Sequence, residues 1–348
     1  MLDGNFSSNN KVWAAGVSGG LWSATNIENA SSEWTKVSDF WDTLNITCVA
    51  SDPTDANIIY LGTGEKIGSG LKGFGIWKTS DGGSTWNQLP SSTDLKYIDT
   101  IIVRDEGGVG AVYAGGGRAL SEGEYTGING LQKSTDGGAT WTEVLGEITT
   151  GSNHHVTDLE LDSNNRLIVA TRTNTFGDGG GQIFYSDDGT VFSAYTIGAL
   201  GSFDRSFVDV SPSDPNVLYA MFESATTGYI TWLGKSEDGG ANWTQKSIGQ
   251  DESGNPFGDY QGSMAYWGFL GIDPNDTNTI YAAGALSIHK STDSGTTWTE
   301  ISEWRGTGFG LPYVHADHHN IVFIDSDKIL VSNDGGVFLT TDGGNTFT

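Results

Sequence analysis

Basic residues are scarce in this 348-residue sequence, which has 17 lysines and arginines against 43 aspartates and glutamates and a net charge of −26. Nucleic acids and anionic membranes are bound by basic surfaces, so this balance argues against both as partners. Long apolar runs are also lacking, because no stretch of 18 apolar residues occurs. The composition therefore predicts a protein that neither binds nucleic acid nor inserts into a membrane.

Cysteine is nearly absent. Cys48 is the single cysteine, so no disulfide framework exists, and its place in the apolar run ITCVA predicts a buried thiol rather than a nucleophile. The first residues, MLDGNFSSNNKVW, lack the basic and apolar regions of a signal peptide. Two interpretations remain open here: a cytoplasmic protein, or one whose signal is missing from this sequence.

Proline is rare, with 7 residues, whereas glycine is abundant, with 51 residues, and 12 tryptophans supply large apolar side chains. Such a glycine content is about twice the average, and it suits a chain with many tight turns. The chain is long enough for two average domains or for one large all-β domain.

A short motif, Ser/Thr-x-Asp-x-Gly-x-Thr-Trp, recurs along the whole chain, as in TSDGGSTW from Thr79 to Trp86. Its aspartates are separated by 49 to 55 residues, and a decayed copy ends at Trp34. Regular spacing of this kind indicates one structural unit repeated. The motif aspartates are Asp81, Asp136, Asp188, Asp238, Asp293 and Asp342.

Each repeat contains four short β-type segments separated by turn residues, and helical periodicity is lacking. We therefore predict an all-β fold, a single seven-bladed β-propeller over residues 1–348 with four-stranded blades. The expected blades are approximately 9–40, 45–92, 97–148, 154–198, 205–250, 266–303 and 315–348. The first expected blade lacks an innermost strand of its own. Either Leu2–Ser8 supplies that strand, or the natural protein continues beyond Thr348 and supplies it. We expect the second, so that this chain is a fragment of a longer protein.

The repeated motifs resemble the Asp-box (BNR-repeat) propellers, which include sortilin-type domains, sialidases and xyloglucanases. The segments YAAGALSIHKSTDSGTTWTEIS, LPYVHADHHNIVF and SNDGGVFLTTDGGNTFT are most similar to large secreted BNR-like repeat proteins of Bacteroidetes, often type IX secretion cargo. The resemblance implies an extracellular or cell-surface location and further domains in the same polypeptide.

The aspartate motif itself is predicted to have a structural role and not to be a binding site. Its carboxylate can accept hydrogen bonds from the turn's own N–H groups, Gly83 allows a positive φ, and Trp86 can pack between neighbouring sheets. One carboxylate per motif cannot supply the oxygens that Ca²⁺ requires, and no phosphate-binding loop is present. Because the motif recurs round the fold, it cannot mark one active site.

The opposite ends of the blades carry the loops of variable length, and we expect the binding face there. These loops are Glu65–Gly75, Gly116–Asn129, Thr173–Gln182, Phe222–Trp232, Gln250–Trp267 and Ser302–Val314. Candidate ligand-contacting aromatics are Tyr260, Tyr266 and Trp267, although such side chains can equally pack on one another. Asp204 is a further candidate on this face.

Histidines cluster at the starts of two expected innermost strands. The candidates at this channel mouth are His154, His155, His315, Asp317, His318 and His319. Alternation along a strand would point His315, Asp317 and His319 the same way and His318 opposite. Three interpretations stay open: a Zn or Mn site formed by His315, Asp317 and His319, a general acid/base pair of His315 and Asp317, or a structural His/Asp network. We expect no cofactor, with Ca²⁺ or another divalent cation as the one alternative.

The favoured functional prediction is a non-catalytic extracellular recognition or adhesion module that binds a protein or a polysaccharide. A sialidase is disfavoured because it needs three arginines around the substrate carboxylate, and the sequence has only six arginines in all. A xyloglucanase is disfavoured because its cleft lies between two propellers. A glycoside hydrolase stays as the alternative, because loop-face carboxylates could form an acid/base pair. These carboxylates are Glu65, Asp94, Asp99, Asp204 and Asp259.

Overall fold

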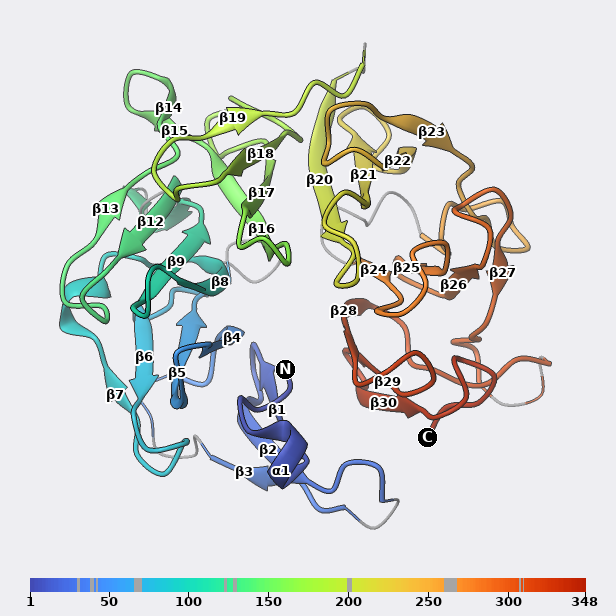
Figure 1. The fold of residues 1–348 in the computed structure, drawn as a ribbon, viewed down its shortest axis with the longest axis horizontal. Coiled ribbons are helices and arrows are strands. Elements are labelled where there is room, and N and C mark those ends of the chain that lie inside the picture. Colours follow the sequence, from blue (N-terminus) through green and yellow to red (C-terminus); the bar gives the residue numbers. More distant parts are fainter. Residues whose placement is uncertain are drawn as a thin grey trace. The chain divides into compact units, whose positions relative to one another are not determined.

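The computed structural model is all-β in the part of the chain that it describes, apart from helix α1 (Phe6–Asn9) and the short 3-10 helix Pro90–Ser92 (Figure 1). The described residues are 1–29, 32–37, 41, 43–65, 71–121, 124–127, 130–198, 202–259, 268–306, 308 and 310–348. None of the described helices is long and apolar enough to cross a membrane.

The chain divides into two compact units, which are treated separately. Unit 1 comprises Met1–Leu161, Asn165–Gly179 and Tyr185–Ser193. Unit 2 comprises Asp162–Asn164, Gly180–Phe184 and Ala194–Thr348.

Unit 1 contains antiparallel sheets whose strands follow one another in the sequence. The first sheet is formed by β1 (Lys11–Gly16), β2 (Gly20–Thr25) and β3 (Thr35–Lys36). The next two sheets have four strands each. One is formed by β4 (Ile46–Asp52), β5 (Asp55–Thr63), β6 (Ile76–Thr79) and β7 (Asn87–Gln88). The other is formed by β8 (Ile98–Asp105), β9 (Gly110–Gly116), β12 (Gly130–Ser134) and β13 (Thr142–Glu143). β16 (His155–Leu161) pairs with β17 (Leu167–Arg172).

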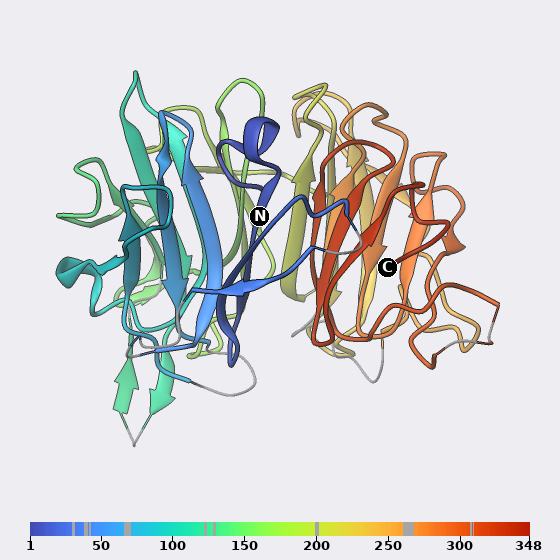
Figure 2. The same cartoon turned by 90° about the horizontal axis from the view of Figure 1, so that it is seen from below.

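Shorter elements complete this region. Two small pairs are formed by β10 (Ala119–Ser121) with β11 (Glu124–Thr126) and by β14 (Glu147–Thr149) with β15 (Ser152–Asn153). Figure 2 shows the β10–β11 pair extending beyond the ends of the neighbouring strands. β18 (Ile183–Ser186) and β19 (Ser193–Ala194) are divided between the two units.

Unit 2 repeats the same plan. One run of paired strands is β20 (Phe203–Val210), β21 (Leu218–Ser224), β22 (Ile230–Ser236), β23 (Thr244–Lys246). Next come β24 (Phe269–Ile272), β25 (Ile280–Ala283), β26 (Ile288–Ser291), β27 (Thr299–Glu300), and finally β28 (His318–Phe323), β29 (Ile329–Asn333), β30 (Gly336–Thr340). Strand pairing thus establishes repeated antiparallel sheets, while the count of seven blades stays a prediction from the sequence repeat.

The first strands of consecutive sheets pack against each other within each unit, β4 against β8 and β8 against β16 in unit 1, and β20 against β24 and β24 against β28 in unit 2. Glycine makes this close approach possible. A Cβ on Gly62 would lie 2.6 Å from Ile98 Cγ2, and one on Gly271 would lie 2.6 Å from Ile321 Cγ2. The small residues in the sheets therefore set the spacing between neighbouring sheets.

The aspartate turns lie between the third and fourth strands. In the first full copy, Asp81 accepts hydrogen bonds from the Thr85 N–H (2.8 Å) and the Thr85 hydroxyl (2.6 Å), and the Thr79 hydroxyl donates to the same carboxylate (2.7 Å). These bonds lower the pKa of Asp81 to about 2. In the Asn242 copy the amide replaces the threonine hydroxyl and donates to Asp238 at 2.7 Å. Each carboxylate is thus used within its own turn.

The motif tryptophans pack toward the preceding sheet. Trp86 lies edge-on to Trp13 with ring centroids 5.9 Å apart, and its indole N–H donates to Gly83 O at 3.1 Å. In unit 2, Trp298 lies 4.9 Å from Phe257 in the same manner, and its N–H donates to Ser247 O at 3.0 Å. Both indoles are apolar contacts between successive repeats, and that of Trp298 also donates a hydrogen bond to the preceding repeat.

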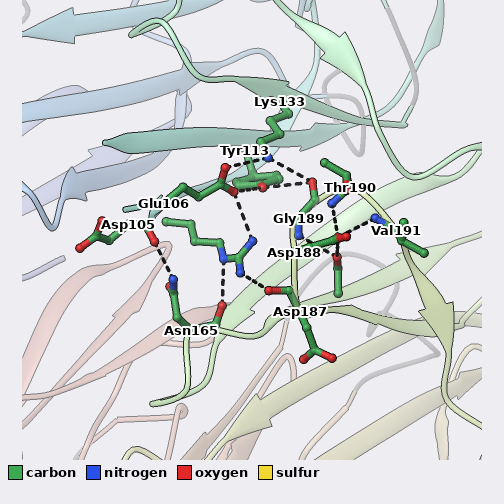
Figure 3. Close-up of polar contacts among 12 residues, drawn as sticks. Asp105, Glu106, Tyr113, Lys133, Asn165, Asp187, Asp188, Gly189, Thr190 and Val191 are labelled. Atoms are coloured by element: carbon green, nitrogen blue, oxygen red, sulfur yellow. Dashed lines mark hydrogen bonds and ion pairs between the residues drawn. The ribbon is translucent and has the colours of Figure 1, made fainter. Parts of the chain in front are cut away.

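A lysine–tyrosine pair forms a second repeated link between successive repeats. In unit 2, Lys290 Nζ and Tyr281 Oη both donate to the carbonyl of Gly343, at 2.9 Å and 3.1 Å. In unit 1, Tyr113 Oη and Lys133 Nζ both donate to Gly189 O, at 3.1 Å and 3.4 Å, and Lys133 also forms an ion pair of 2.8 Å with Glu106 (Figure 3). The carbonyl that accepts belongs to the next aspartate turn, so the turns join the repeats in two ways.

The start of the chain forms only a short pairing with the first sheet. Residues 1–3 pair with β1, because Leu2 faces Val12 and Asp3 N donates to Lys11 O at 2.9 Å. The rest of the expected Leu2–Ser8 segment turns into helix α1 instead of extending as a strand. Asp3 also accepts the indole N–H of Trp13 at 2.8 Å, which stabilises this turn.

Candidate functional site

A cavity of about 310 Å³ lies in unit 2 and is lined mainly by polar and charged side chains. Its lining residues are Tyr229, Asp251, Glu252, Ser253, Asn255, Leu286, Ser287, Glu300, Glu303, Trp304 and Arg305. Three of the loops predicted to form the binding face contribute to it, namely Phe222–Trp232, Gln250–Trp267 and Ser302–Val314. The cavity therefore forms where variable loops converge.

Glu303 and Arg305 form a fixed pair in the wall of the cavity. Arg305 donates to Glu303 through its backbone N–H (2.8 Å), Nε (2.9 Å) and Nη2 (2.6 Å). Glu303 is buried, and these hydrogen bonds lower the pKa of its carboxyl group below the ordinary value. The pair consequently keeps one ionised carboxylate in a fixed orientation.

Glu300, at the end of β27, behaves in the opposite way. Burial raises the pKa of its carboxyl group, and the nearby charges of Asp251, Glu303 and Glu252 raise it further. Glu300 and Glu303 thus hold protons with different affinities within one cavity. Such a divergence of carboxyl pKa values is typical of acid/base sites.

Asp251 organises the loop on the other side of the cavity. Its carboxylate accepts hydrogen bonds from the N–H groups of Ser253 (2.9 Å) and Asn255 (2.8 Å) and from the Asn255 amide (2.9 Å). The loop is closed further by Asp251 N, which donates to Asn255 O at 3.0 Å. This segment is therefore a compact turn that holds the adjacent Glu252 at the cavity.

Two aromatic side chains border the cavity. Trp304 is 42% exposed, which is high for an indole, and Tyr229 is half-buried. An aromatic face next to carboxylates is typical of sites that bind sugars, because the ring packs on the C–H face of the sugar and the oxygens accept its hydroxyls.

The predicted histidine candidates of unit 1 form a different local arrangement. His155 is fully buried and its Nε2 is paired with the carboxylate of Asp99 on the neighbouring first strand β8. Its ring lies under Gly117, where a Cβ would approach it to 2.8 Å. His154 is also buried, and desolvation lowers the pKa of its imidazole. These histidines therefore belong to the packing between strands.

β-Bulges occur near the starts of the first strands, and they place polar side chains there. Register shifts fall at Asp99 in β8, at Thr157 in β16 and at Thr47 in β4, all in unit 1. Unit 2 has the same feature at Asp204 in β20 and at His319 in β28. Bulges re-aim a side chain out of strand alternation, which explains how Asp99 turns toward His155.

The histidines of the HADHH segment separate into a buried and an exposed group. His318 is fully buried against Phe269, whereas His319 is 41% exposed and pairs with Asp334 at 2.7 Å. The predicted alternation does not extend to His315 and Asp317, because β28 begins only at His318 and Asp317 has a φ of +64°. Burial raises the pKa of Asp317, and the charge of Asp334 raises it further.

The predicted metal site of His315, Asp317 and His319 is not assembled in the described part of the chain, where no group of three His, Cys, Asp or Glu side chains could hold a metal ion. Instead, His315 Nδ1 contacts Ala316 O at 2.9 Å and its ring lies against Gly335. These contacts are those of a hydrogen-bonded network between the β28 start and the β29–β30 turn. Three other candidates, Tyr260, Tyr266 and Trp267, lie outside the described residues.

Comparison with known proteins finds no family model that matches the chain. The chain is 29% identical over 319 residues to a xyloglucanase of Hypocrea jecorina (strain QM6a), covering 79% of the chain and 35% of that protein. It is 26% identical over 309 residues to a xyloglucanase of Paenibacillus sp, covering 80% of the chain and 29% of that protein. The chain thus spans about a third of the length of these curated relatives.

Solved structures show the same type of fold. A GH74 xyloglucanase of Xanthomonas campestris matches 98% of the chain with a TM-score of 0.54 and 16% identity, over 66% of its own chain. YCF48 bound to D1 peptide matches 95% of the chain with a TM-score of 0.58 and 16% identity, over 89% of its own chain. Identities this low show the fold alone, an all-β chain with propeller-like neighbours.

The comparisons correct the main functional prediction. A non-catalytic recognition or adhesion module is the wrong interpretation, because the curated relatives are xyloglucanases. The same relatives correct the expectation that the protein is not an enzyme. The alternative, a glycoside hydrolase, is the interpretation that they favour. The expected cleft between two propellers was not a sufficient ground for rejecting this activity.

Sequence reasoning also missed the cavity carboxylates. It named the loops Gln250–Trp267 and Ser302–Val314 but singled out other acidic residues, of which Asp259 is fully buried. The spacing in EISEWR, with Glu300, Glu303, Trp304 and Arg305 within six residues, was the signal available. It went unused because the segment directly follows a scaffold motif.

Proposed function

We propose that the chain belongs to a glycoside hydrolase that acts on a neutral polysaccharide of the xyloglucan type. The observation that carries the proposal is the 29% identity over 319 residues to a xyloglucanase, which extends over most of the chain. The relatives are about three times as long as this chain, so the proposed activity is taken from proteins of which the chain matches about a third.

The chemistry of the unit 2 cavity supports hydrolysis. Glycoside hydrolysis needs a protonated carboxylic acid beside the leaving oxygen and negative charge beside the sugar ring, on which positive charge develops. Glu300, whose pKa is raised, suits the role of proton donor, and the ionised Glu303 suits electrostatic stabilisation of the sugar. In this proposal the proton of Glu300 passes to the glycosidic oxygen as the C–O bond breaks. A water molecule then bonds to the anomeric carbon, and the proton that it releases restores the protonated Glu300.

The finer structural and cellular assignments are part of the same proposal. The regular repeat supports a seven-bladed propeller with four-stranded blades and Asp-box (BNR-repeat) turns, of the secreted BNR-like group seen in Bacteroidetes. A polysaccharide substrate suits work outside the cell or at its surface. The partner is then the polysaccharide itself.

Purified protein is expected to release reducing ends from xyloglucan. Glu300→Gln keeps the size of the side chain but removes its proton, so turnover should fall by about 100-fold or more. Glu237→Gln is the control, because Glu237 is 73% exposed on an aspartate turn of the same unit. Reducing-sugar assays on xyloglucan, mixed-linkage glucan and polygalacturonate measure the effect. Lack of turnover on every neutral polysaccharide would overturn the proposed function.

A further inference from the structure

We propose that the unit 2 cavity is a binding subsite for one or two units of a neutral oligosaccharide, with Trp304 as the stacking platform and Glu300 as a hydroxyl acceptor. The inference deepens the proposed function and rests on it for the choice of sugar. It assigns sugar binding to named residues of the cavity, of which Trp304 has no part in the proposed bond cleavage.

The size and shape of the cavity fit this ligand class. A volume of about 310 Å³ lies at the lower end of the range of small-molecule sites, which is about 300–1,000 Å³. It is lined by residues from three separate loops, by Leu286 and Ser287 just before β26, and by Glu300 at the end of β27. Such a cavity holds a short piece of a longer chain.

The apolar contribution comes from Trp304. Its exposed indole lies beside Glu303, which is held by Arg305 and by the backbone pairing of Glu303 N with Pro312 O at 2.8 Å. The segment that carries the indole is thus fixed before any ligand arrives. Fixed aromatic faces contribute strongly to binding because little conformational entropy is lost.

The charges of the cavity select against acidic sugars. The cavity is lined by the carboxylates of Asp251, Glu252 and Glu303 and by the carboxyl group of Glu300, against one guanidinium, that of Arg305. Arg305 is already paired with Glu303 at 2.6 Å and lies 3.7 Å from Glu252, so it does not provide a separate anion site. A neutral sugar donates its hydroxyls to these oxygens, whereas a uronic acid would be repelled.

The test measures binding by calorimetry, with a xyloglucan-derived oligosaccharide as the probe and a galacturonic acid oligomer of equal length as the anionic comparison. Measurement in Glu300→Gln as well as in the unaltered protein separates binding from turnover. We expect Trp304→Ala to weaken binding of the neutral probe by at least about tenfold in both backgrounds. Trp304→Phe should keep most of the affinity, and Val191→Ala, which removes an exposed apolar side chain in unit 1, should keep all of it.

The outcomes separate the two proposals. Binding that depends on Trp304 without any turnover would overturn the proposed hydrolysis and leave the subsite standing. Turnover with binding that is equal in Trp304→Ala and in the unaltered protein would overturn the subsite alone. The subsite is also overturned if the neutral probe does not bind, if the anionic oligomer binds as tightly, or if a lysine oligopeptide binds at this cavity in preference to the sugar.

Discussion

Gly115→Ala is expected to destabilise unit 1 by about 1–3 kcal/mol, because the added methyl group enters a space that the next sheet already fills. An ideal Cβ on Gly115 would lie 2.4 Å from Val156 Cγ1 and 3.0 Å from Thr100 Cγ2. Val156 is fully buried on β16, so it cannot move into solvent. Urea-induced unfolding followed by tryptophan fluorescence measures the change.

Two comparisons identify the cause of this loss. Gly19→Ala serves as the matched control, since the nearest atom to its Cβ would be Trp22 Nε1 at 3.8 Å, and its stability should hardly change. Adding Val156→Ala to Gly115→Ala should recover part of the loss, because the smaller side chain makes room for the methyl group. If Gly115→Ala is as stable as Gly19→Ala, the sheets of unit 1 are not packed through β9 and β16.

Acid is expected to destabilise unit 2 as the pH falls from about 6.5 to about 4.5, before most carboxylates are protonated. Burial lowers the pKa of His289 to about 4 and that of His318 to about 3. The unfolded chain therefore binds two protons in this range that the folded chain does not. The free energy of unfolding should decrease by up to about 2.7 kcal/mol per pH unit, about 1.4 kcal/mol for each histidine.

Variants without these imidazoles test the origin of the acid effect. The ring of His289 lies edge-on to Phe257 at 5.9 Å and that of His318 lies edge-on to Phe269 at 6.0 Å, so leucine suits both places. Melting temperatures of His289→Leu and His318→Leu, measured from pH 7 to pH 4.5, should fall less steeply than those of the unaltered protein. An unchanged slope in the double variant would contradict the assignment, whatever the stability at pH 7.

The parts of the fold that could be read from the sequence are those repeated locally. The aspartate turn was predictable because Asp81, Thr79 and Thr85 bond to one another within seven residues. The link from Lys290 to Gly343 was not predictable, because its partner lies 53 residues away and depends on how the next sheet packs. The bulge at Asp99 was hidden for the same reason, since strand alternation carries no mark of an extra residue.

The candidate site was likewise predictable only in those features that are local in the sequence. The loops that converge could be named in advance, because their lengths vary while the aspartate turns do not. Which side chains meet could not, because Asp251 and Glu300 lie 49 residues apart and come together only through unit 2. The proton affinity of Glu300 likewise depends on burial and on neighbouring charges.

A crystal structure of the protein with a bound xyloglucan oligosaccharide tests the central claim most directly, namely that the unit 2 cavity receives a neutral sugar chain. The account predicts a sugar ring on the face of Trp304, with a hydroxyl group within hydrogen-bond distance of the Glu300 carboxyl group. A sugar chain bound elsewhere on the molecule, with no sugar against Trp304, would contradict it.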